Sequence, residues 1–411
     1  MITEQTDIII SGAGLTGCTL AALLAKQGIS STIIESSNSA FKSSSARKDP
    51  RILSLTPATK RILSSIDIWH QLPVGKIGGF EKIHIWDDDT KADIVFNCSD
   101  VCAPALGYIV GQAVLQEVLE KLINSIPIIN TMTGVTIASY IEDDGMINCE
   151  LSDGRVIKSR LLVGADGANS QIRNLAGIAV ECIDYHQKAV ACIVQTQIPH
   201  DKIARQRFLS TGPLAFLPMH EENQCGVVWS TQSELADALL VLDDREFCLA
   251  LEEAFESRLG EVQRCEQRVG FKLHRNQALS YFNRLCVLVG DAAHTVHPLA
   301  GQGANLGITD AAVLSQLLQQ AKLDDRMLVS RQVLRNYERW RKTENKKMTL
   351  ILEGLKNFFE AENDLVSFIR GNGMMMINHS PFIKNRIMKY AMGLSGDVPS
   401  IINGPLIKEF I

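Results

Sequence analysis

The strongest alternation of apolar and polar segments lies at the start of the chain. The apolar run 7–11 predicts a short buried strand, segment 15–26 has the apolar spacing of a helix, and 31–35 predicts a second strand. Gly28, just after the helical segment, suits a left-handed helix cap. The N-terminal segment therefore predicts a strand–helix–strand unit with two parallel strands.

Two later apolar runs repeat part of this pattern. Residues 161–164 and 285–289 each predict a buried strand, and a helical segment, 304–318, follows the second run. Between these runs the pattern changes to β strands and amphipathic helices. Strands are predicted over 83–86, 94–97, 135–140, 146–151, 190–197, 205–209, 214–218, 226–229 and 269–273, and helices over 56–66, 112–124, 234–240, 245–259 and from about 330 to the end, with a break at 371–376.

These elements predict a mixed α/β (α+β) fold, with a Rossmann-like nucleotide-binding domain, an inserted β-sheet domain and C-terminal helices. Because the buried strands recur far apart along the chain, the nucleotide-binding domain is expected to be discontinuous. The expected divisions are 1–75, 105–180 and 280–345 for the nucleotide-binding domain, 76–104 and 181–279 for a substrate-binding β-sheet domain, and 346–411 for a C-terminal helical segment.

Composition narrows the class of protein. Of the 411 residues, 46% are hydrophobic and 21% are charged, which indicates a globular protein with a large core. A net charge of −5 argues against nucleic acid as a partner. The ten cysteines show no metal-ligand spacing, so we expect no metal, and buried, reduced thiols in a cytoplasmic protein. The uncharged stretch 8–25 is broken by glycines and follows acidic residues, so neither a membrane span nor an export signal is expected.

The first motif that carries chemistry is Gly12-Ala13-Gly14-Leu15-Thr16-Gly17, between the first strand and the first helix. Gly12 permits a tight turn, Gly14 lets a pyrophosphate approach the backbone, and Gly17 lets the helix pack closely on the sheet. Unpaired N–H groups at the helix N-terminus then face the phosphates. Glu35 ends the next strand, and its carboxylate could accept hydrogen bonds from ribose hydroxyls. The alternative is a glycine-rich turn without a ligand.

The second motif, 164–173, again joins a buried strand to a short helix. Asn169 or Ser170 suits the N-cap of this helix. Asp166 could order the backbone around the pyrophosphate, and Arg173 could supply positive charge. An ordinary turn followed by a surface arginine is the alternative.

The third motif, 290–307, joins the last buried strand to the helix 304–318 through a glycine-rich loop. Asp291 could hold the hydroxyls of a flavin ribityl chain, and helix N–H groups could face the N1–C2=O edge of the flavin ring, where reduced flavin is negative. Structural roles are the alternative for His294 and His297. The residues expected to line the flavin are His297, Pro298, Gly301, Gln302, Gly303, Ala304 and Asn305.

Together the three motifs resemble those of the class A FAD-dependent aromatic hydroxylases, which have the p-hydroxybenzoate hydroxylase fold. Segments 49–55, 212–218 and 228–230 are similar to the ubiquinone-biosynthesis hydroxylases within this class, and the likeness spans roughly 5–345. The resemblance implies that Arg51 lies near the flavin ring and phosphates. It also implies that Gln112 lies near the ribityl chain.

The resemblance further implies a monooxygenase. NAD(P)H or another electron donor would reduce FAD, O₂ would form a flavin C4a-hydroperoxide, and its distal oxygen would hydroxylate the aromatic ring of a polyprenyl-phenol intermediate. The protein would mainly position the reactants and exclude water, so no side chain is assigned as catalytic. Candidates to line the substrate are Phe216, Pro218 and Trp229, and plain core packing is their alternative.

Because this substrate is lipophilic, the C-terminal segment could touch the inner membrane peripherally or contact a ubiquinone-biosynthesis complex. An ordinary capping helix or a homo-oligomer contact is the alternative. Two other functions remain open at this point. One is a flavin oxidoreductase or halogenase of the same fold acting on another small molecule, and the other is a flavoprotein scaffold without turnover.

Overall fold

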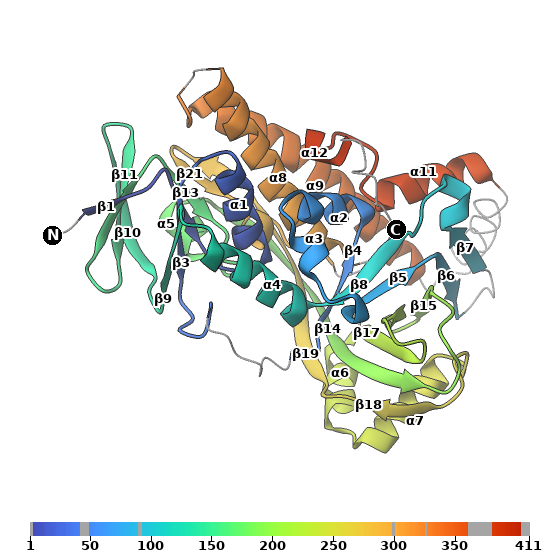
Figure 1. Ribbon diagram of the computed structural model, residues 1–411. Coiled ribbons are helices and arrows are strands. Elements are labelled where there is room, and N and C mark those ends of the chain that lie inside the picture. The colour runs from blue at the N-terminus through green and yellow to red at the C-terminus, as the bar shows by residue number, and fades with distance from the viewer. Residues whose placement is uncertain are drawn as a thin grey trace.

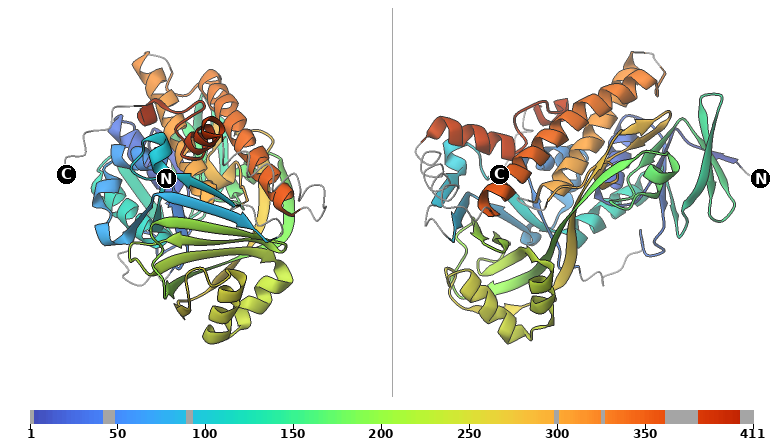
Figure 2. Two further views of the ribbon diagram at one scale, coloured as in Figure 1. Left: turned by 90° about the vertical axis from the view of Figure 1, so that its right-hand side faces the viewer. Right: turned by 180° about the vertical axis from the view of Figure 1, so that it is seen from behind.

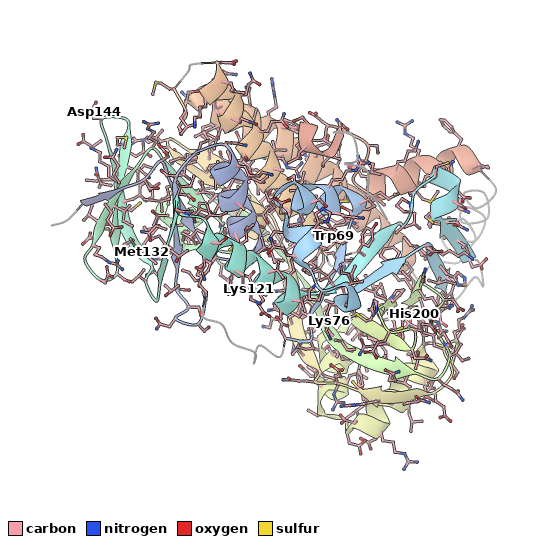
Figure 3. All side chains as sticks on the ribbon, in the orientation of Figure 1. Trp69, Lys76, Lys121, Met132, Asp144 and His200 are labelled. Atoms are coloured by element: carbon pink, nitrogen blue, oxygen red, sulfur yellow. The ribbon has the colours of Figure 1, made fainter. Side chains whose placement is uncertain are left out.

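The computed structural model describes residues 3–41, 49–88, 93–297, 301–324, 327–360 and 380–403, without the side chains of 355 and 358–360. Figures 1 and 2 show an elongated molecule. A small sheet lies at the end that carries the N-terminus, a β-rich lobe lies at the lower right of Figure 1, and long helices lie along the top. Asp144, at the turn between two strands of the small sheet, marks the far left of the molecule (Figure 3).

A six-stranded sheet forms the centre of the larger part. Its strand order is β20-β21-β13-β2-β3-β9, and all neighbours are parallel except β20 and β21. Ile8, Leu162 and Val287 are completely buried because helices cover both faces of a parallel sheet. The strands are β2 (Ile8–Ser11), β3 (Ser31–Glu35), β9 (Ile129–Thr133), β13 (Leu161–Gly164), β20 (Phe282–Asn283) and β21 (Cys286–Leu288).

The helix α1 (Leu15–Lys26) connects β2 to β3, which confirms the predicted strand–helix–strand unit. It packs against α8 (Gln302–Leu323) and α4 (Gln112–Ser125), and α8 packs against the long helix α9 (Arg331–Glu360). These helices and the six-stranded sheet share one hydrophobic core.

A second, antiparallel-rich sheet forms the lobe at the lower right of Figure 1. Its strand order is β18-β14-β17-β16-β15-β6-β7, and β19 also pairs with β14. The helices α6 (Ser233–Val241) and α7 (Asp244–Ala254) cover one face, and the Asp243 side chain begins α7 with a capping box. The strands are β6 (Lys82–Asp87), β7 (Asp93–Asn97), β14 (Val180–Thr196), β15 (Ile203–Leu209), β16 (Gly212–Pro218), β17 (Gln224–Gln232), β18 (Val262–Cys265) and β19 (Val269–Ala278).

Two smaller sheets complete the described structure. One has the order β4-β8-β5 and lies between the two larger sheets, and the other has the order β1-β12-β11-β10. Their strands are β4 (Ile52–Leu55), β5 (Ile77–Phe80), β8 (Gly107–Gly111), β1 (Thr3–Gln5), β10 (Ile137–Asp143), β11 (Met146–Leu151) and β12 (Val156–Ser159), and the short helices are α2 (Pro57–Ser65), α3 (Ile68–Gln71), α5 (Gln171–Leu175), α11 (Pro381–Ala391) and α12 (Ser400–Asn403).

Some boundaries and one burial prediction are wrong. The strand predicted to start at 190 starts at Val180, because pairing with β19 extends it through an exposed stretch that lacks an apolar signal. The helix predicted to reach 259 ends at Ala254, before two residues with positive φ. Eight cysteines are buried, but Cys102 and Cys182 are exposed. The predicted break at 371–376 lies outside the described residues.

The larger sheets come from different parts of the sequence. We propose that the six-stranded sheet is the centre of the nucleotide-binding domain and that the second sheet is the centre of the substrate-binding domain, with the domain boundaries predicted from the sequence. Within the described part of the chain, every helix is too short or too polar to cross a bilayer.

Candidate functional site

Three turns lie side by side at the carboxyl ends of β2, β13 and β21, which are parallel neighbours. The first and second turns touch, because a Cβ atom on Gly12 would lie 2.3 Å from the carbonyl oxygen of Ala165. The first and third also touch, since a Cβ on Gly290 would lie 2.9 Å from Oγ1 of Thr16. This edge of an open parallel sheet is where such folds bind nucleotides.

The first turn has the geometry of a phosphate cradle. Gly14 is the N-cap of α1 and provides no side-chain hydrogen bond, so the first N–H groups of the helix keep no side-chain acceptor. A Cβ atom on Gly14 would meet no described atom within 4 Å, whereas one on Gly17 would lie 2.1 Å from the carbonyl oxygen of Gly12. Gly14 therefore faces open space and Gly17 faces the packed interior.

Glu35 braces the first turn from the end of β3. Its Oε2 atom accepts a hydrogen bond from the backbone N–H of Ala13 at 2.9 Å, and its Oε1 atom accepts one from Ser37 at 2.8 Å. Oε1 also accepts from Oγ of Ser36 at 3.2 Å. A carboxylate has about four acceptor positions, so a ribose hydroxyl could still bind it.

The second turn is stabilised by its own side chains. Asp166 accepts hydrogen bonds from Oγ of Ser170 at 2.5 Å and from the backbone N–H of Ile172 at 3.0 Å, and Ser170 is the N-cap of α5. Arg173 is buried and donates to the carbonyl oxygens of Ala168 and Ala292, both at 3.0 Å. The alternative of a surface arginine is therefore wrong: Arg173 joins the second turn to the third.

Asp291 lies in the third turn, a 3-10 helix over Gly290–Ala292. The residue is exposed to solvent, yet burial by the surrounding protein raises the pKa of its carboxyl group, while nearby His294 opposes that rise. An exposed acid at this turn suits a hydroxyl-rich ligand, because a carboxylate accepts hydrogen bonds from hydroxyl groups. His294 itself is buried and pairs with Asp310.

The N-terminus of α8 also faces open space. Gly301 is its N-cap with φ +59° and no side-chain cap, and a Cβ on Gly303 would meet no described atom within 4 Å. Gln302 is buried, and Ala304 follows in the first turn of the helix. Backbone N–H groups at such an end attract negative charge.

Asn305, a predicted cofactor contact, has its side chain fully engaged elsewhere. Oδ1 accepts from the N–H of Thr56 at 3.0 Å and from Oγ1 of Thr59 at 2.7 Å, and Nδ2 donates to the carbonyl oxygens of Ser54 and Gly301 at 2.8 and 3.0 Å. The side chain thus joins α8 to α2, and its hydrogen-bonding positions are all used within the protein.

His297 is 1% exposed. Its Nε2 atom lies 3.3 Å from Oε1 of Gln187, and its ring lies edge-on to Tyr185 with centroids 5.1 Å apart. Burial, with a smaller contribution from the charge of Lys356, lowers the pKa of His297 to about 4. His297 is therefore neutral at pH 7. Pro298 lies outside the described residues.

This lowered pKa makes stability depend on pH. An unfolded histidine binds a proton below about pH 6.5, whereas folded His297 binds one only below about pH 4. The unfolded chain therefore holds more protons between these values, so acidification from pH 6.5 to pH 4 costs up to about 3 kcal/mol of unfolding free energy. Urea unfolding at pH 7.5 and pH 5 should show a larger loss for the wild type than for His297→Gln. Equal losses would contradict this assignment.

Arg51 and Gln112 lie next to each other beside this site. The backbone N–H of Gln112, the first residue of α4, donates to the carbonyl oxygen of Arg51 at 3.0 Å. The guanidinium of Arg51 is 51% exposed and pairs with Asp49 at 2.6 Å. The Arg51 side chain is thus exposed and paired with Asp49, and Gln112 is half-buried at the start of α4.

Sequence reasoning missed Gln116 and Glu120, which reach the first turn from α4. Nε2 of Gln116 donates to the carbonyl oxygen of Ala13 at 2.8 Å and to Oε1 of Glu120 at 2.9 Å. The other oxygen of Glu120 accepts from the N–H of Phe41 at 3.1 Å. Gln116 and Glu120 are four residues apart in a predicted amphipathic helix, and this spacing indicates that the two side chains lie next to each other.

The predicted substrate-lining residues fall on an unexpected face. Phe216 and Trp229 are 1% and 5% exposed and pack with α6 and α7, and Phe216 stacks on Phe255 with centroids 3.9 Å apart. Pro218 is buried too. Because strand side chains alternate, Leu217 points to the other face, where it packs against the same hydrophobic cluster as Ile52 of β4.

The residues at this edge fit an extended dinucleotide cofactor such as FAD. Two uncapped helix N-termini, two open glycine positions and one accessible acid lie around the same three turns. Within the described residues, no group of three or more His, Cys, Asp or Glu side chains is placed to hold a metal.

Comparison with known proteins supports this fit. The model of the FAD binding domain family matches residues 5–349. The chain is 32% identical over 397 residues to 3-demethoxyubiquinol 3-hydroxylase of Escherichia coli (strain K12), covering 96% of this chain and 100% of that protein. It is 31% identical to ubiquinone hydroxylase UbiL of Rhodospirillum rubrum, covering 98% and 93%.

Solved structures agree on the fold. The p-nitrophenol 4-monooxygenase PnpA from Pseudomonas putida DLL-E4 has a TM-score of 0.77 at 16% identity, covering 96% of this chain and all of that one. The OxyS anhydrotetracycline hydroxylase from Streptomyces rimosus has a TM-score of 0.71 at 19% identity, covering 96% and 77%. At these identities the likeness concerns the fold alone. With the family match, it places this chain among the FAD-dependent aromatic hydroxylases and monooxygenases of the p-hydroxybenzoate hydroxylase fold.

Proposed function

We propose that this enzyme hydroxylates the aromatic ring of a polyprenyl-phenol intermediate in ubiquinone biosynthesis. The observation that carries the proposal is the likeness, over almost the whole chain, to ubiquinone hydroxylases at 32% and 31% identity. The three turns that lie side by side at one edge of the parallel sheet agree with it. NAD(P)H or another donor and O₂ are the proposed co-substrates.

Each part of the edge has a proposed task toward FAD, which when bound supplies the redox and oxygen-transfer chemistry. The N-terminus of α1, with Gly14 open, holds the pyrophosphate, and Glu35 accepts from the ribose. Asp291 accepts from the ribityl hydroxyls. The N-terminus of α8, at Gly303 and Ala304, stabilises negative charge on the flavin pyrimidine edge.

The proposed position of the substrate follows from which face of the second sheet the helices cover. Since α6 and α7 cover the face that carries Phe216, we propose the opposite face, with Ala215, Leu217 and Val228, as the one nearer the phenol ring. That face packs toward β4, and Arg51 directly precedes this strand. A mainly apolar wall there excludes water from the ring.

The decisive experiment uses the FAD-loaded protein with a prenylated phenol, reduced nicotinamide and isotopically labelled dioxygen. Transfer of one labelled oxygen atom to the ring, detected by mass spectrometry, is the expected result. Substrate-stimulated flavin oxidation without labelled product would favour an oxidoreductase, and halide incorporation a halogenase. FAD binding without any turnover would favour a scaffold. A phenol without a prenyl chain is the matched control for substrate class.

Replacing His297 tests whether its side chain acts as a general acid or base. Because it is neutral and packed against Gln187 and Tyr185, His297→Ala should lower kcat by less than about tenfold, well below the roughly 10²- to 10⁴-fold loss typical of a general acid or base. Steady-state turnover of the FAD-saturated variant measures this. A loss in the larger range would make His297 a catalytic group.

A further inference from the structure

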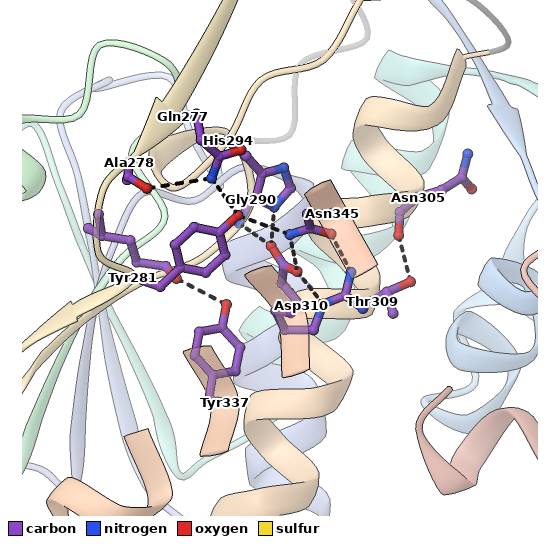
Figure 4. A network of polar contacts seen from close by, with 12 residues as sticks. Gln277, Ala278, Tyr281, Gly290, His294, Asn305, Thr309, Asp310, Tyr337 and Asn345 are labelled. Carbon is purple, nitrogen blue, oxygen red and sulfur yellow. Dashed lines mark hydrogen bonds and ion pairs between the residues drawn. The ribbon is translucent and has the colours of Figure 1, made fainter. Parts of the chain in front are cut away.

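A closed polar network lies directly behind the third turn (Figure 4). At its centre is Asp310, which is completely buried within α8. Its carboxylate accepts from Nε2 of His294 at 2.5 Å, the backbone N–H of Gly290 at 3.0 Å, Nε of Arg341 at 2.6 Å and Nδ2 of Asn345 at 3.3 Å. Since a carboxylate only accepts, Nε2 of His294 carries a proton.

Two of these donors hold the turn that carries Asp291. Gly290 has φ +59°, and its N–H is bound to Asp310. Its carbonyl oxygen accepts from the N–H groups of Ala293 at 2.8 Å and His294 at 3.0 Å. Both peptide groups of Gly290, the residue directly before Asp291, are therefore held by hydrogen bonds, one of them by the Asp310 carboxylate.

The other two donors come from α9. Arg341 is 2% exposed and also donates to Oδ1 of Asn345 at 2.7 Å. Burial alone would raise the pKa of Asp310, but His294 and Arg341 hold it well below its usual range. A buried ion pair of this kind adds little net stability, although removal of one partner is costly.

We propose that Asp310 is a positioning residue: through the N–H of Gly290 it sets the turn that presents Asp291 to FAD, and through Arg341 it joins that turn to α9. The inference rests on the proposed role of Asp291 in the FAD site. It predicts that an acceptor for the Gly290 N–H, and not the negative charge, is what FAD affinity requires.

Two double variants separate these possibilities. Both remove the buried charges, but Asp310→Asn/Arg341→Met keeps an amide oxygen that can face Gly290 and His294, whereas Asp310→Leu/Arg341→Met keeps no acceptor. We expect the asparagine variant to bind FAD within about threefold of the wild type and the leucine variant to bind at least about tenfold more weakly, the cost of an unsatisfied buried donor. Quenching of FAD fluorescence by the apoproteins gives the affinities.

Thermal unfolding of the two apoproteins shows whether they are equally stable, so that an affinity difference reflects positioning. Equal FAD affinities for the two would overturn the proposal. If the leucine variant does not fold, Asp310→Asn alone replaces it, because there Arg341 competes with Gly290 for the single amide oxygen. Asp310→Asn must then bind FAD more weakly than Asp310→Asn/Arg341→Met does, and equal FAD affinities of these two variants overturn the proposal. Wild-type affinity and the effect of Asp291→Ala test the FAD site itself, independently of Asp310.

Discussion

Replacing Gly14 with valine is expected to abolish measurable FAD binding in a protein that stays folded. A Cβ on Gly14 would meet no described atom within 4 Å, so we expect the apoprotein to accommodate a larger side chain there. The same side chain would occupy the place that we propose for the pyrophosphate. Loss of even two charge-assisted hydrogen bonds to phosphate should weaken binding by at least about 100-fold. Fluorescence titration with FAD measures the loss, and thermal unfolding of the apoprotein checks the fold.

Gly17→Ala is the matched control in the same motif. Its Cβ would lie 2.1 Å from the carbonyl oxygen of Gly12, so this smaller change should destabilise the apoprotein itself, while Gly14→Val should not. A lower melting temperature for Gly14→Val than for Gly17→Ala, or an unchanged FAD affinity in Gly14→Val, would contradict the placement of the pyrophosphate at this turn.

Replacing Asp291 with alanine is expected to weaken FAD binding by about 10- to 100-fold, since a charged acceptor contributes roughly 1.5–3 kcal/mol through its hydrogen bonds. The same substitution should leave the stability of the apoprotein unchanged or raise it. Burial raises the pKa of Asp291, so the folded chain holds this proton more tightly than the unfolded chain does. Stability from this group is therefore lost as the pH rises through its folded pKa, and alanine removes this pH-dependent cost.

The measurement for Asp291→Ala is paired: FAD affinity by fluorescence titration, and urea unfolding of the apoprotein at pH 7. We expect weaker affinity together with unchanged or greater stability. Asp166→Ala is the control, because the Asp166 carboxylate accepts from the N-cap Ser170 and from the Ile172 N–H of α5, so its loss should lower stability. Full FAD retention in Asp291→Ala would contradict the ribityl role.

Much of the site could be predicted from the sequence because its chemistry is local. The first turn, its helix and Glu35 lie within one strand–helix–strand unit, and glycine positions in such a unit follow from backbone geometry. Arg173, Gln116 and Asp310 could not be assigned in this way. Arg173 meets Ala292 and Asp310 meets Arg341 across separations that no periodicity encodes.

The amino-acid sequence by itself determined the three turns, the buried parallel strands that precede them and the family that they indicate. Tertiary structure alone decided which face of the second sheet Phe216 and Trp229 occupy, and that the Asn305 side chain holds α2. The reason is physical. Apolar spacing shows that a side chain is buried, but its neighbours come from other segments, tens to hundreds of residues away. Those neighbours decide whether a buried group packs, braces a turn or faces a ligand.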